Sequence, residues 1–280
     1  MADSATDFFG VAAADVDMGP DVGFQDFLAR VGSLEVPFFN EARAKPTISG
    51  VANGAGFAAN LPVAPGSIIS VFGWSLAEFT GGATHLPLPP ALKHVSVGFD
   101  FPEDGVSVPG RLFYSSDGQL NVQVPWELAG RNFAVMKTRI EDSVSETVII
   151  DLADYAPGLF EFNTSGRELL VAAHADGSIV TPDNPARPGE TIVVYGTGFG
   201  PVDRAQRSGV AAEGLARVTG DVRATVGGLD AAVSFAGLTP GFVGLYQANV
   251  TLPASLPPGE HSFALISNGI ESNAGTLVVR

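Results

Sequence analysis

Residues 64–73 read APGSIISVFG, and residues 187–196 read RPGETIVVYG, so one pattern recurs at an offset of 123 positions. In both stretches a Pro-Gly pair precedes an apolar, β-branched run that a glycine ends. Proline presets φ and glycine tolerates positive φ, so the chain turns before the run begins. A short apolar run between such turns is typical of a β-strand. The repeated turn and strand predict a duplicated β-unit.

A second pair of matching stretches follows in the same order. Residues 119–125 read QLNVQVP and residues 247–253 read QANVTLP, at an offset of 128. Val122 and Val124 alternate with Asn121 and Gln123, which is the period-2 pattern of a half-buried strand. The proline at the end of each stretch has no amide hydrogen to donate, so it ends the pairing. Two signatures in one order indicate an internal repeat.

Further short apolar runs lie between the signatures, separated by Gly, Pro, Asp and Ser. They cover residues 92–97, 106–114, 133–140 and 144–152 in the first copy and residues 168–173, 222–226, 231–236, 261–267 and 275–279 in the second. Strands and turns that alternate about every ten residues favour antiparallel sandwiches over β-α units. The sequence therefore predicts an all-β fold with two tandem immunoglobulin-like β-sandwiches.

Three segments are expected along the chain: an N-terminal extension at residues 1–45, a first sandwich at 46–154 and a second at 155–280. The boundary lies at the Pro-Gly junction within Asp154–Gly158. Because this junction is short, we expect the two sandwiches to have a restrained relative orientation.

The N-terminal extension is predicted to contain one small helix. Four apolar residues have the i, i+3, i+4, i+7 spacing of one helical face, namely Phe24, Phe27, Leu28 and Val31. Asp21 is placed to cap the start of this helix, and Gly32 is placed to end it. The extension is acidic, with 8 acids and 3 bases in residues 1–45.

An extended apolar segment, Leu34–Phe39, follows the predicted helix. We expect it either to pack on the first sandwich or to add to the open sheet edge of a neighbouring subunit, and both alternatives stay open. The extension thus supplies the candidate contacts for a protein partner: Phe24, Phe27, Leu28, Val31, Val36, Phe38 and Phe39.

The charge balance excludes several classes of function. Acids outnumber bases 30 to 15, which gives a formal charge of −15, and Lys and Arg form no cluster that could track phosphates. No apolar run approaches the roughly 20 residues that span a bilayer, so no direct membrane insertion is expected. The chain has no cysteine, which excludes disulfides, thiolate metal sites and cysteine nucleophiles.

Several longer motifs occur in one order along the chain, at residues 63–73, 118–128, 155–160, 184–189, 195–201 and 238–247. Together they resemble the uncharacterised C-terminal domain of acidobacterial (Solibacter-type) exported proteins. The resemblance implies tandem immunoglobulin-like domains of the IPT/TIG type, without an established activity or catalytic residues. It runs from about residue 47 to the end, so residues 1–45 lie outside it.

The motifs of enzymes are weak or missing. Residues 195–201 (YGTGFGP) superficially resemble a dinucleotide loop, but Pro201 and the following glycines break up the helix that the fingerprint requires. The four histidines, His85, His94, His174 and His261, share no ligand-like spacing. There is no HExxH and no Gly-x-Ser-x-Gly motif. The sequence therefore predicts neither an enzyme nor a cofactor.

Two ligand classes remain as alternatives. Acidic groups at Asp100, Glu103 and Asp104, and at Asp15, Asp17 and Asp21, suggest calcium, although neither follows the order of an EF-hand. Trp74, Tyr114, Trp126 and Tyr246 suggest a sugar-stacking platform, with Trp126 as the candidate glycan contact. For the acidic groups we favour solvated loops without a metal. For the aromatic residues we favour packing in the core.

The sequence hypothesis is therefore a non-enzymatic structural or interaction protein, extracellular or on the cell surface. It would act through protein-protein contacts or self-association by way of the N-terminal arm. A carbohydrate-binding module and a scaffold subunit of a larger membrane or enzyme complex are the alternatives. Residues 1–29 do not form a signal peptide, since they lack Lys, Arg and a continuous apolar core. A cytoplasmic location stays open.

Overall fold

The structure, a computed structural model, describes residues 23–280 except residues 32, 43 and 60. Within these residues the regular structure is β-strand throughout, apart from one turn of 3-10 helix, η1 (Trp126–Leu128). The predicted all-β class is confirmed. The chain divides into two compact units, Met1–Lys45 and Pro46–Arg280.

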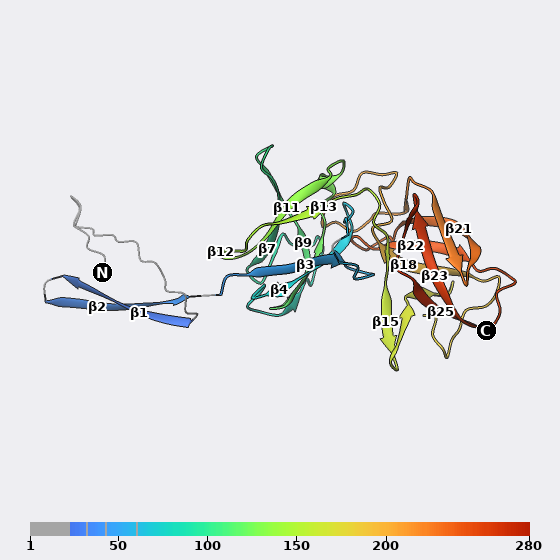
Figure 1. The fold of residues 1–280 in the computed structure, drawn as a ribbon, viewed down its shortest axis with the longest axis horizontal. Coiled ribbons are helices and arrows are strands. Elements are labelled where there is room, and N and C mark those ends of the chain that lie inside the picture. The colour runs from blue at the N-terminus through green and yellow to red at the C-terminus, as the bar shows by residue number, and fades with distance from the viewer. Residues whose placement is uncertain (1–22, 32, 43, 60) are drawn as a thin grey trace. The chain divides into compact units, whose positions relative to one another are not determined.

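The described part of the first unit is a β-hairpin (Figure 1). Strand β1 (Gly23–Val31) pairs antiparallel with β2 (Leu34–Ala42), in a register that sets Phe27 opposite Phe38 and Val31 opposite Leu34. Only residues 32 and 33 lie between the strands, and two-residue connections are the commonest in hairpins.

The helix predicted over residues 24–31 is wrong, because this segment is the strand β1. Aromatic and β-branched residues favour strands, and the apolar segment after residue 33 supplies a partner strand of equal length. Alternation along a strand also separates the residues of the supposed helical face. Phe24 and Leu28 lie on one face of the hairpin, and Phe27 lies on the other. Asp21, the expected cap, lies outside the described residues.

The first half of the second unit holds two antiparallel sheets. One has the order β3 (Thr47–Asn53), β4 (Ile68–Trp74), β10 (Gln119–Gln123), β9 (Arg111–Ser115), β5 (Gly81–Gly82). The other has the order β12 (Ser143–Val144), β11 (Phe133–Ile140), β7 (Val95–Phe101), β6 (Ala91–Leu92), with β13 (Val148–Asp151) on β11 and β8 (Val106–Pro109) on β7. A core containing Val71, Phe99, Val122 and Met136 draws residues from both sheets.

In the second half, one connected order joins most of the strands. Its strands run in the order β14 (Gly158–Leu159), β18 (Thr191–Thr197), β22 (Tyr246–Thr251), β21 (Leu229–Leu238), β20 (Val222–Val226), β23 (Gly259–Ser267), β24 (Ile270–Glu271). Three shorter pairings add β17 (Ala172–Ala173) to β18, β19 (Ala216–Arg217) to β21 and β25 (Gly275–Val279) to β23. A separate hairpin, β15 (Glu161–Thr164) and β16 (Arg167–Leu170), extends beside them (Figure 1). A second core, with Phe199, Tyr246 and Phe263, fills this half.

The two repeat signatures are hydrogen-bonded neighbours in each half, at the same register. Phe72 on β4 pairs with Gln119 on β10. Their counterparts at the offsets of 123 and 128, Tyr195 on β18 and Gln247 on β22, pair with each other in the same way. The internal repeat inferred from sequence is thus a repeat of strand pairing.

One predicted run proves to serve two sheets. Residues 106–114 were expected as a single run, whereas β8 pairs with β7 and β9 pairs with β10. In the second half the single strand β21 makes both kinds of pairing. Its residues 229–231 pair with β20, and its residues 232–238 pair with β22. Several other predicted runs keep their limits, notably β11, β20 and β25.

Two separate cores lie on either side of the predicted domain boundary, one within residues 63–152 and one within residues 159–279. We keep the boundary after Asp154 as a proposal that this division supports. Residues 46–154 are called the first half below, and residues 155–280 the second half.

Candidate functional site

The hairpin carries apolar side chains on both faces. Phe27, Ala29, Leu34, Val36 and Phe38 share one face, where Phe27 stacks on Phe38 at a centroid distance of 5.3 Å. The other face combines Phe24, Leu28 and Phe39 with the ion pair Arg30–Glu35 at 2.7 Å.

Most of these apolar side chains are largely exposed. Phe24 is 74% exposed, Phe39 is 71% exposed and Leu34 is 64% exposed, while Leu28, Val36 and Phe38 are each close to half exposed. The structure therefore brings six of the seven predicted contact residues onto one hairpin, divided between its two faces. The side chain of Val31 lies outside the described residues. Leu34 was missed as a contact, although its place opposite Val31 follows from the register.

The two halves of the second unit meet through buried polar groups. Gln123 is 1% exposed, and its Oε1 accepts from Gly209 N at 2.7 Å while its Nε2 donates to Gly66 O at 3.4 Å. Thr197 is fully buried, and its Oγ1 accepts from Ile68 N at 2.9 Å and donates to Gly244 O at 2.8 Å. Buried polar groups must be paired to avoid a desolvation cost. At this junction both buried side chains are paired, and each makes one of its hydrogen bonds to the other half.

The glycine-rich run at 195–201 belongs to the same junction. A Cβ on Gly198 would lie 2.3 Å from Ala156 O, and a Cβ on Gly200 would lie 2.3 Å from the ring of Tyr155. Both glycines also have positive φ, at +73° and +124°. The glycines allow residues 154–158, which join the two halves, to approach closely, so close packing accounts for this run of glycines.

Trp126 crosses the junction from η1. It belongs to the first half, yet its half-buried ring packs against the core of the second half. A Cβ on Gly66 would lie 2.2 Å from the Trp126 ring. Trp126 N donates to Ser208 Oγ at 2.9 Å, and Ser208 Oγ in turn donates to Glu127 Oε2 at 2.5 Å.

A cavity of about 400 Å³ opens beside Trp126. Both halves contribute to its lining, which includes Pro65, Trp126, Asp154, Asp203, Arg204 and Gln206. The other aromatic residues expected in a sugar platform lie elsewhere. Tyr246 is fully buried in the second core, and Trp74 is 63% exposed on β4 and does not line this cavity.

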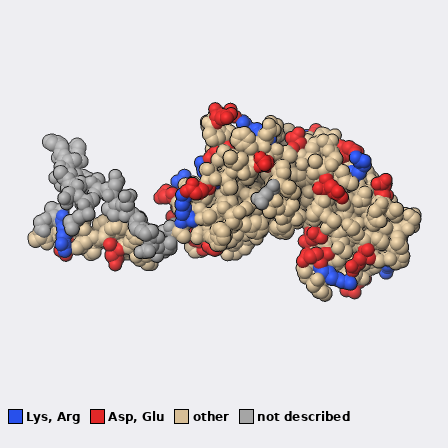
Figure 2. All heavy atoms as spheres, viewed as in Figure 1, with Lys and Arg blue, Asp and Glu red and all other residues tan. Residues whose placement is uncertain are grey.

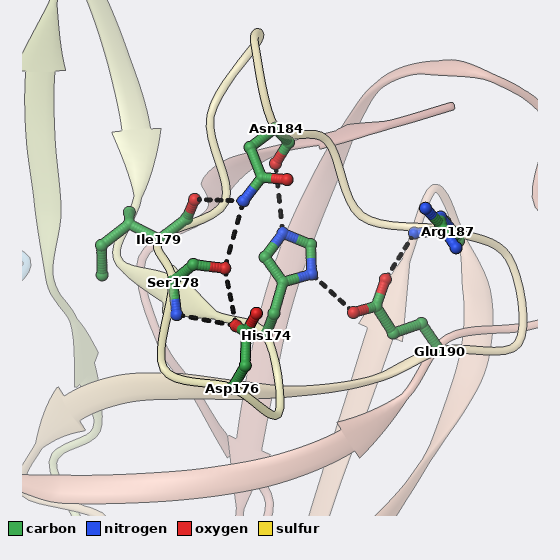
Figure 3. A network of polar contacts seen from close by, with 7 residues as sticks. All are labelled: His174, Asp176, Ser178, Ile179, Asn184, Arg187 and Glu190. Atoms are coloured by element: carbon green, nitrogen blue, oxygen red, sulfur yellow. Dashed lines mark hydrogen bonds and ion pairs between the residues drawn. The ribbon is translucent and has the colours of Figure 1, made fainter.

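A second polar site is built around His174, in the loop between β17 and β18 (Figure 3). Its Nδ1 lies 2.5 Å from Glu190 Oε1, and its Nε2 lies 3.1 Å from Asn184 O. An imidazolium can donate from both nitrogens, so two acceptors favour the protonated ring. Burial acts to lower the pKa of His174, but the contacts with Glu190 and Asn184 outweigh it and hold that pKa above 6.5.

The remaining contacts of this network join Asp176, Ser178 and Asn184. Asp176 Oδ1 accepts from Ser178 Oγ at 2.7 Å, and Asn184 Nδ2 donates to Ser178 Oγ at 3.2 Å. The Ser178 hydroxyl therefore bonds Asp176 and Asn184 in place of a ring nitrogen of His174, which differs from a nucleophile-base pair. The sequence spacing of 16 residues between His174 and Glu190 offered no signal for this contact.

Two of the acidic residues considered for calcium, Asp100 and Asp104, are engaged in ion pairs. Asp100 Oδ2 lies 2.5 Å from Lys137 Nζ, and Asp104 lies 2.6 Å from Arg131. Burial acts to raise the pKa of Asp100, but Lys137 and Ser107 outweigh it and lower that pKa below its ordinary value. Asp15, Asp17 and Asp21 lie outside the described residues. Among the residues that are described, no three acidic or histidine side chains gather as metal ligands would.

Charged groups are spread over the second unit. Figure 2 shows acidic and basic side chains scattered over the visible face, with wide uncharged areas between them.

No protein-family model matches the chain, and no curated protein matches it. Solved structures show a distant similarity. The SGBP-B protein of the Bacteroides ovatus mixed-linkage glucan utilization locus, solved with a mixed-linkage heptasaccharide, is 11% identical with a TM-score of 0.34, over 97% of this chain and 59% of that chain.

Two further solved structures are similar at the same distant level. Domains 4–9 of the surface layer protein SbsC are 13% identical, with a TM-score of 0.24, over 99% of this chain and 41% of that one. The I9–I11 tandem from titin is 12% identical, with a TM-score of 0.24, over 91% of this chain and 73% of that one. The chain thus spans less than two thirds of both the SGBP-B structure, at 59%, and the SbsC structure, at 41%.

Proposed function

We propose that this chain is a non-enzymatic protein of the cell surface or extracellular space that acts through protein-protein contacts made by its N-terminal hairpin. The observation that carries the proposal is the hairpin of β1 and β2, whose two faces both expose large apolar side chains. The partner that we propose is a second copy of the same chain.

The energetics of a hairpin support a docking role. An isolated two-stranded hairpin is at best marginally stable in water, and stability needs further strands or packing against another element. Burial of a large apolar side chain contributes about 1.5–3 kcal/mol. Several such side chains are available here, including Phe24 and Phe39. A partner that covered one face would stabilise both the hairpin and the complex.

The second unit is proposed to serve as the scaffold. Its finer assignment, two immunoglobulin-like sandwiches of the IPT/TIG type from the Solibacter-type family, is part of this proposal and is supported by the repeated strand register. The paired polar groups at the junction, Gln123 and Thr197, suit a unit that holds a fixed form. No helix among the described residues has the length and apolar character needed to cross a membrane.

The test compares the mass in solution of the full chain with that of a hairpin variant. We expect the full chain to associate as concentration rises, as measured by light scattering, and the double variant Phe24→Ser, Phe39→Ser to remain monomeric. Phe79→Ser is the matched control, because Phe79 is a 55% exposed phenylalanine of the second unit.

Three results can be told apart. Loss of association in the hairpin variant alone supports the proposal. If the full chain stays monomeric at every concentration, self-association is wrong. A monomeric full chain whose melting temperature falls in the hairpin variant would instead show that the hairpin packs on its own second unit.

A further inference from the structure

The cavity beside Trp126 has the composition of a small-molecule site. Its volume of about 400 Å³ falls within the roughly 300–1,000 Å³ that such sites occupy, and it lies where two halves meet, a common place for them. An indole ring lines it together with two carboxylates, a guanidinium and a side-chain amide, from Asp154, Asp203, Arg204 and Gln206.

Trp126 is not required by the fold of one half. Its counterpart at the offset of 128 is Ala254, whereas the neighbouring Leu128 and Leu256 are both leucine and both buried. The backbone turn is also the same in both copies, since Leu128 N donates to Pro125 O and Leu256 N donates to Pro253 O. The aromatic ring is therefore a feature of the junction and its cavity, added to a turn that forms without it.

The polar lining is available for a ligand. Within the described residues, no hydrogen bond or ion pair engages the side chains of Asp154 and Arg204, and both residues are exposed. Gln206 is half-exposed, and its Nε2 makes a long contact of 3.2 Å with Arg204 O. These groups offer both donors and acceptors around an aromatic surface.

We propose that this cavity binds a neutral saccharide of one or two sugar units. The apolar C–H face of a sugar ring packs on an aromatic ring, and its hydroxyls both donate and accept hydrogen bonds, so the lining matches this ligand class. Trp126 supplies the platform, while Asp154, Arg204 and Gln206 bond the hydroxyls. Two carboxylates against one guanidinium, on a chain of charge −15, disfavour an anionic sugar.

The test uses the two tryptophans of the chain. In a Trp74→Phe variant Trp126 is the remaining indole, so its fluorescence reports directly on the cavity. This variant is titrated with neutral disaccharides of glucose in α and β linkage, of xylose and of mannose, and with a disaccharide of uronic acid. We expect saturable quenching or a blue shift with at least one neutral member and none with the uronic acid.

Rim variants locate the binding. Arg204→Ala and Gln206→Ala are expected to weaken binding about tenfold each, as the loss of a hydrogen bond to a charged or polar group would. Trp74→Ala is the matched aromatic control and should bind as the full chain does. Trp126→Ala is also made, with a melting curve to separate loss of the platform from loss of the junction.

Calorimetric titration provides a second measure of binding. The inference is overturned if no neutral saccharide changes the Trp126 fluorescence or releases heat at saccharide concentrations up to about 10 mM, well above a millimolar dissociation constant. It is also overturned if binding occurs but Arg204→Ala and Gln206→Ala leave it unchanged. The hairpin variants Phe24→Ser and Phe39→Ser should not affect this binding, so its outcome is independent of the proposed protein contacts.

Discussion

At the scale of single residues, Gly66 and Gly189 show how the two copies diverge. Both follow a proline in the repeated turn, and both have positive φ, at +81° and +76°. A Cβ on Gly189 would meet nothing within 4 Å, whereas a Cβ on Gly66 would meet the Trp126 ring at 2.2 Å. Both positions favour glycine because of their positive φ. Only at Gly66 would a side chain also collide with a neighbouring ring, that of Trp126.

The paired variants Gly66→Ala and Gly189→Ala test this difference. Left-handed backbone costs an L-residue about 1–2 kcal/mol, so Gly189→Ala should lose about that much stability. Gly66→Ala should lose clearly more, because the ring of Trp126 must move. Chemical denaturation measures both losses. Equal losses would mean that Trp126 shifts freely. Adding Trp126→Ala to Gly66→Ala should recover part of the difference.

At the scale of an element, the loop between β17 and β18 is held by His174. Ala52 pairs with Ser70 and Ala173 pairs with Val193, so Asn53 and His174 are counterparts by register. Asn53 Nδ2 donates to Ala156 O at 2.9 Å, in the segment that joins the two halves. At the equivalent place in the second half, His174 contacts Glu190, whose counterpart Ser67 is buried at the junction. Equivalent positions therefore have different contacts in the two copies. Asn53 contacts the segment that joins the halves, whereas His174 belongs to a polar network within the second half.

The pH dependence of stability tests the His174 network. The pKa of His174 is raised on folding, so its stabilising effect is full below pH 6.5 and is lost as pH rises through the raised value. We expect the full chain to lose more stability than His174→Asn between pH 6 and pH 9, because the full chain loses a hydrogen bond to a charged group, a kind of bond that contributes about 1.5–3 kcal/mol. Parallel denaturation profiles across this range would contradict the role of the charged ring.

At the scale of the whole second unit, the junction couples the halves. Thr197 and Gln123 each bond backbone groups of the other half from buried positions. A short connection alone would restrain orientation only loosely, whereas these bonds specify one arrangement. We therefore expect the halves of Pro46–Arg280 to unfold together.

Thr197→Val tests this coupling. The substitution keeps the shape but leaves Ile68 N and Gly244 O without their partner, at a cost of about 1–3 kcal/mol for each unsatisfied group. Calorimetry should show one transition for the full chain and a broadened or split transition for the variant. Thr191→Val is the control, because the contact of Thr191 Oγ1 with Thr251 Oγ1 is exposed. A single unchanged transition in Thr197→Val would show that the coupling lies elsewhere.

The fold class and the repeat followed from sequence because both depend on local pattern. Pro-Gly turns, period-2 alternation and matching signatures are readable along the chain, and the paired register of Phe72 with Gln119 and Tyr195 with Gln247 agrees with them. The hairpin was misjudged for the same reason. The spacing of Phe24, Phe27, Leu28 and Val31 suits a helix locally, and only the pairing with residues 34–42 selects the strand.

By itself, then, the sequence determined the β class, the duplication and the apolar character of the N-terminal arm. The tertiary structure alone decided which residues meet across the chain: Gln123 with Gly209, His174 with Glu190, and Trp126 with the second core. The physical reason is distance along the chain. Turn and strand preferences act between near neighbours, whereas a junction, a polar network and a cavity depend on contacts between segments that only packing brings together.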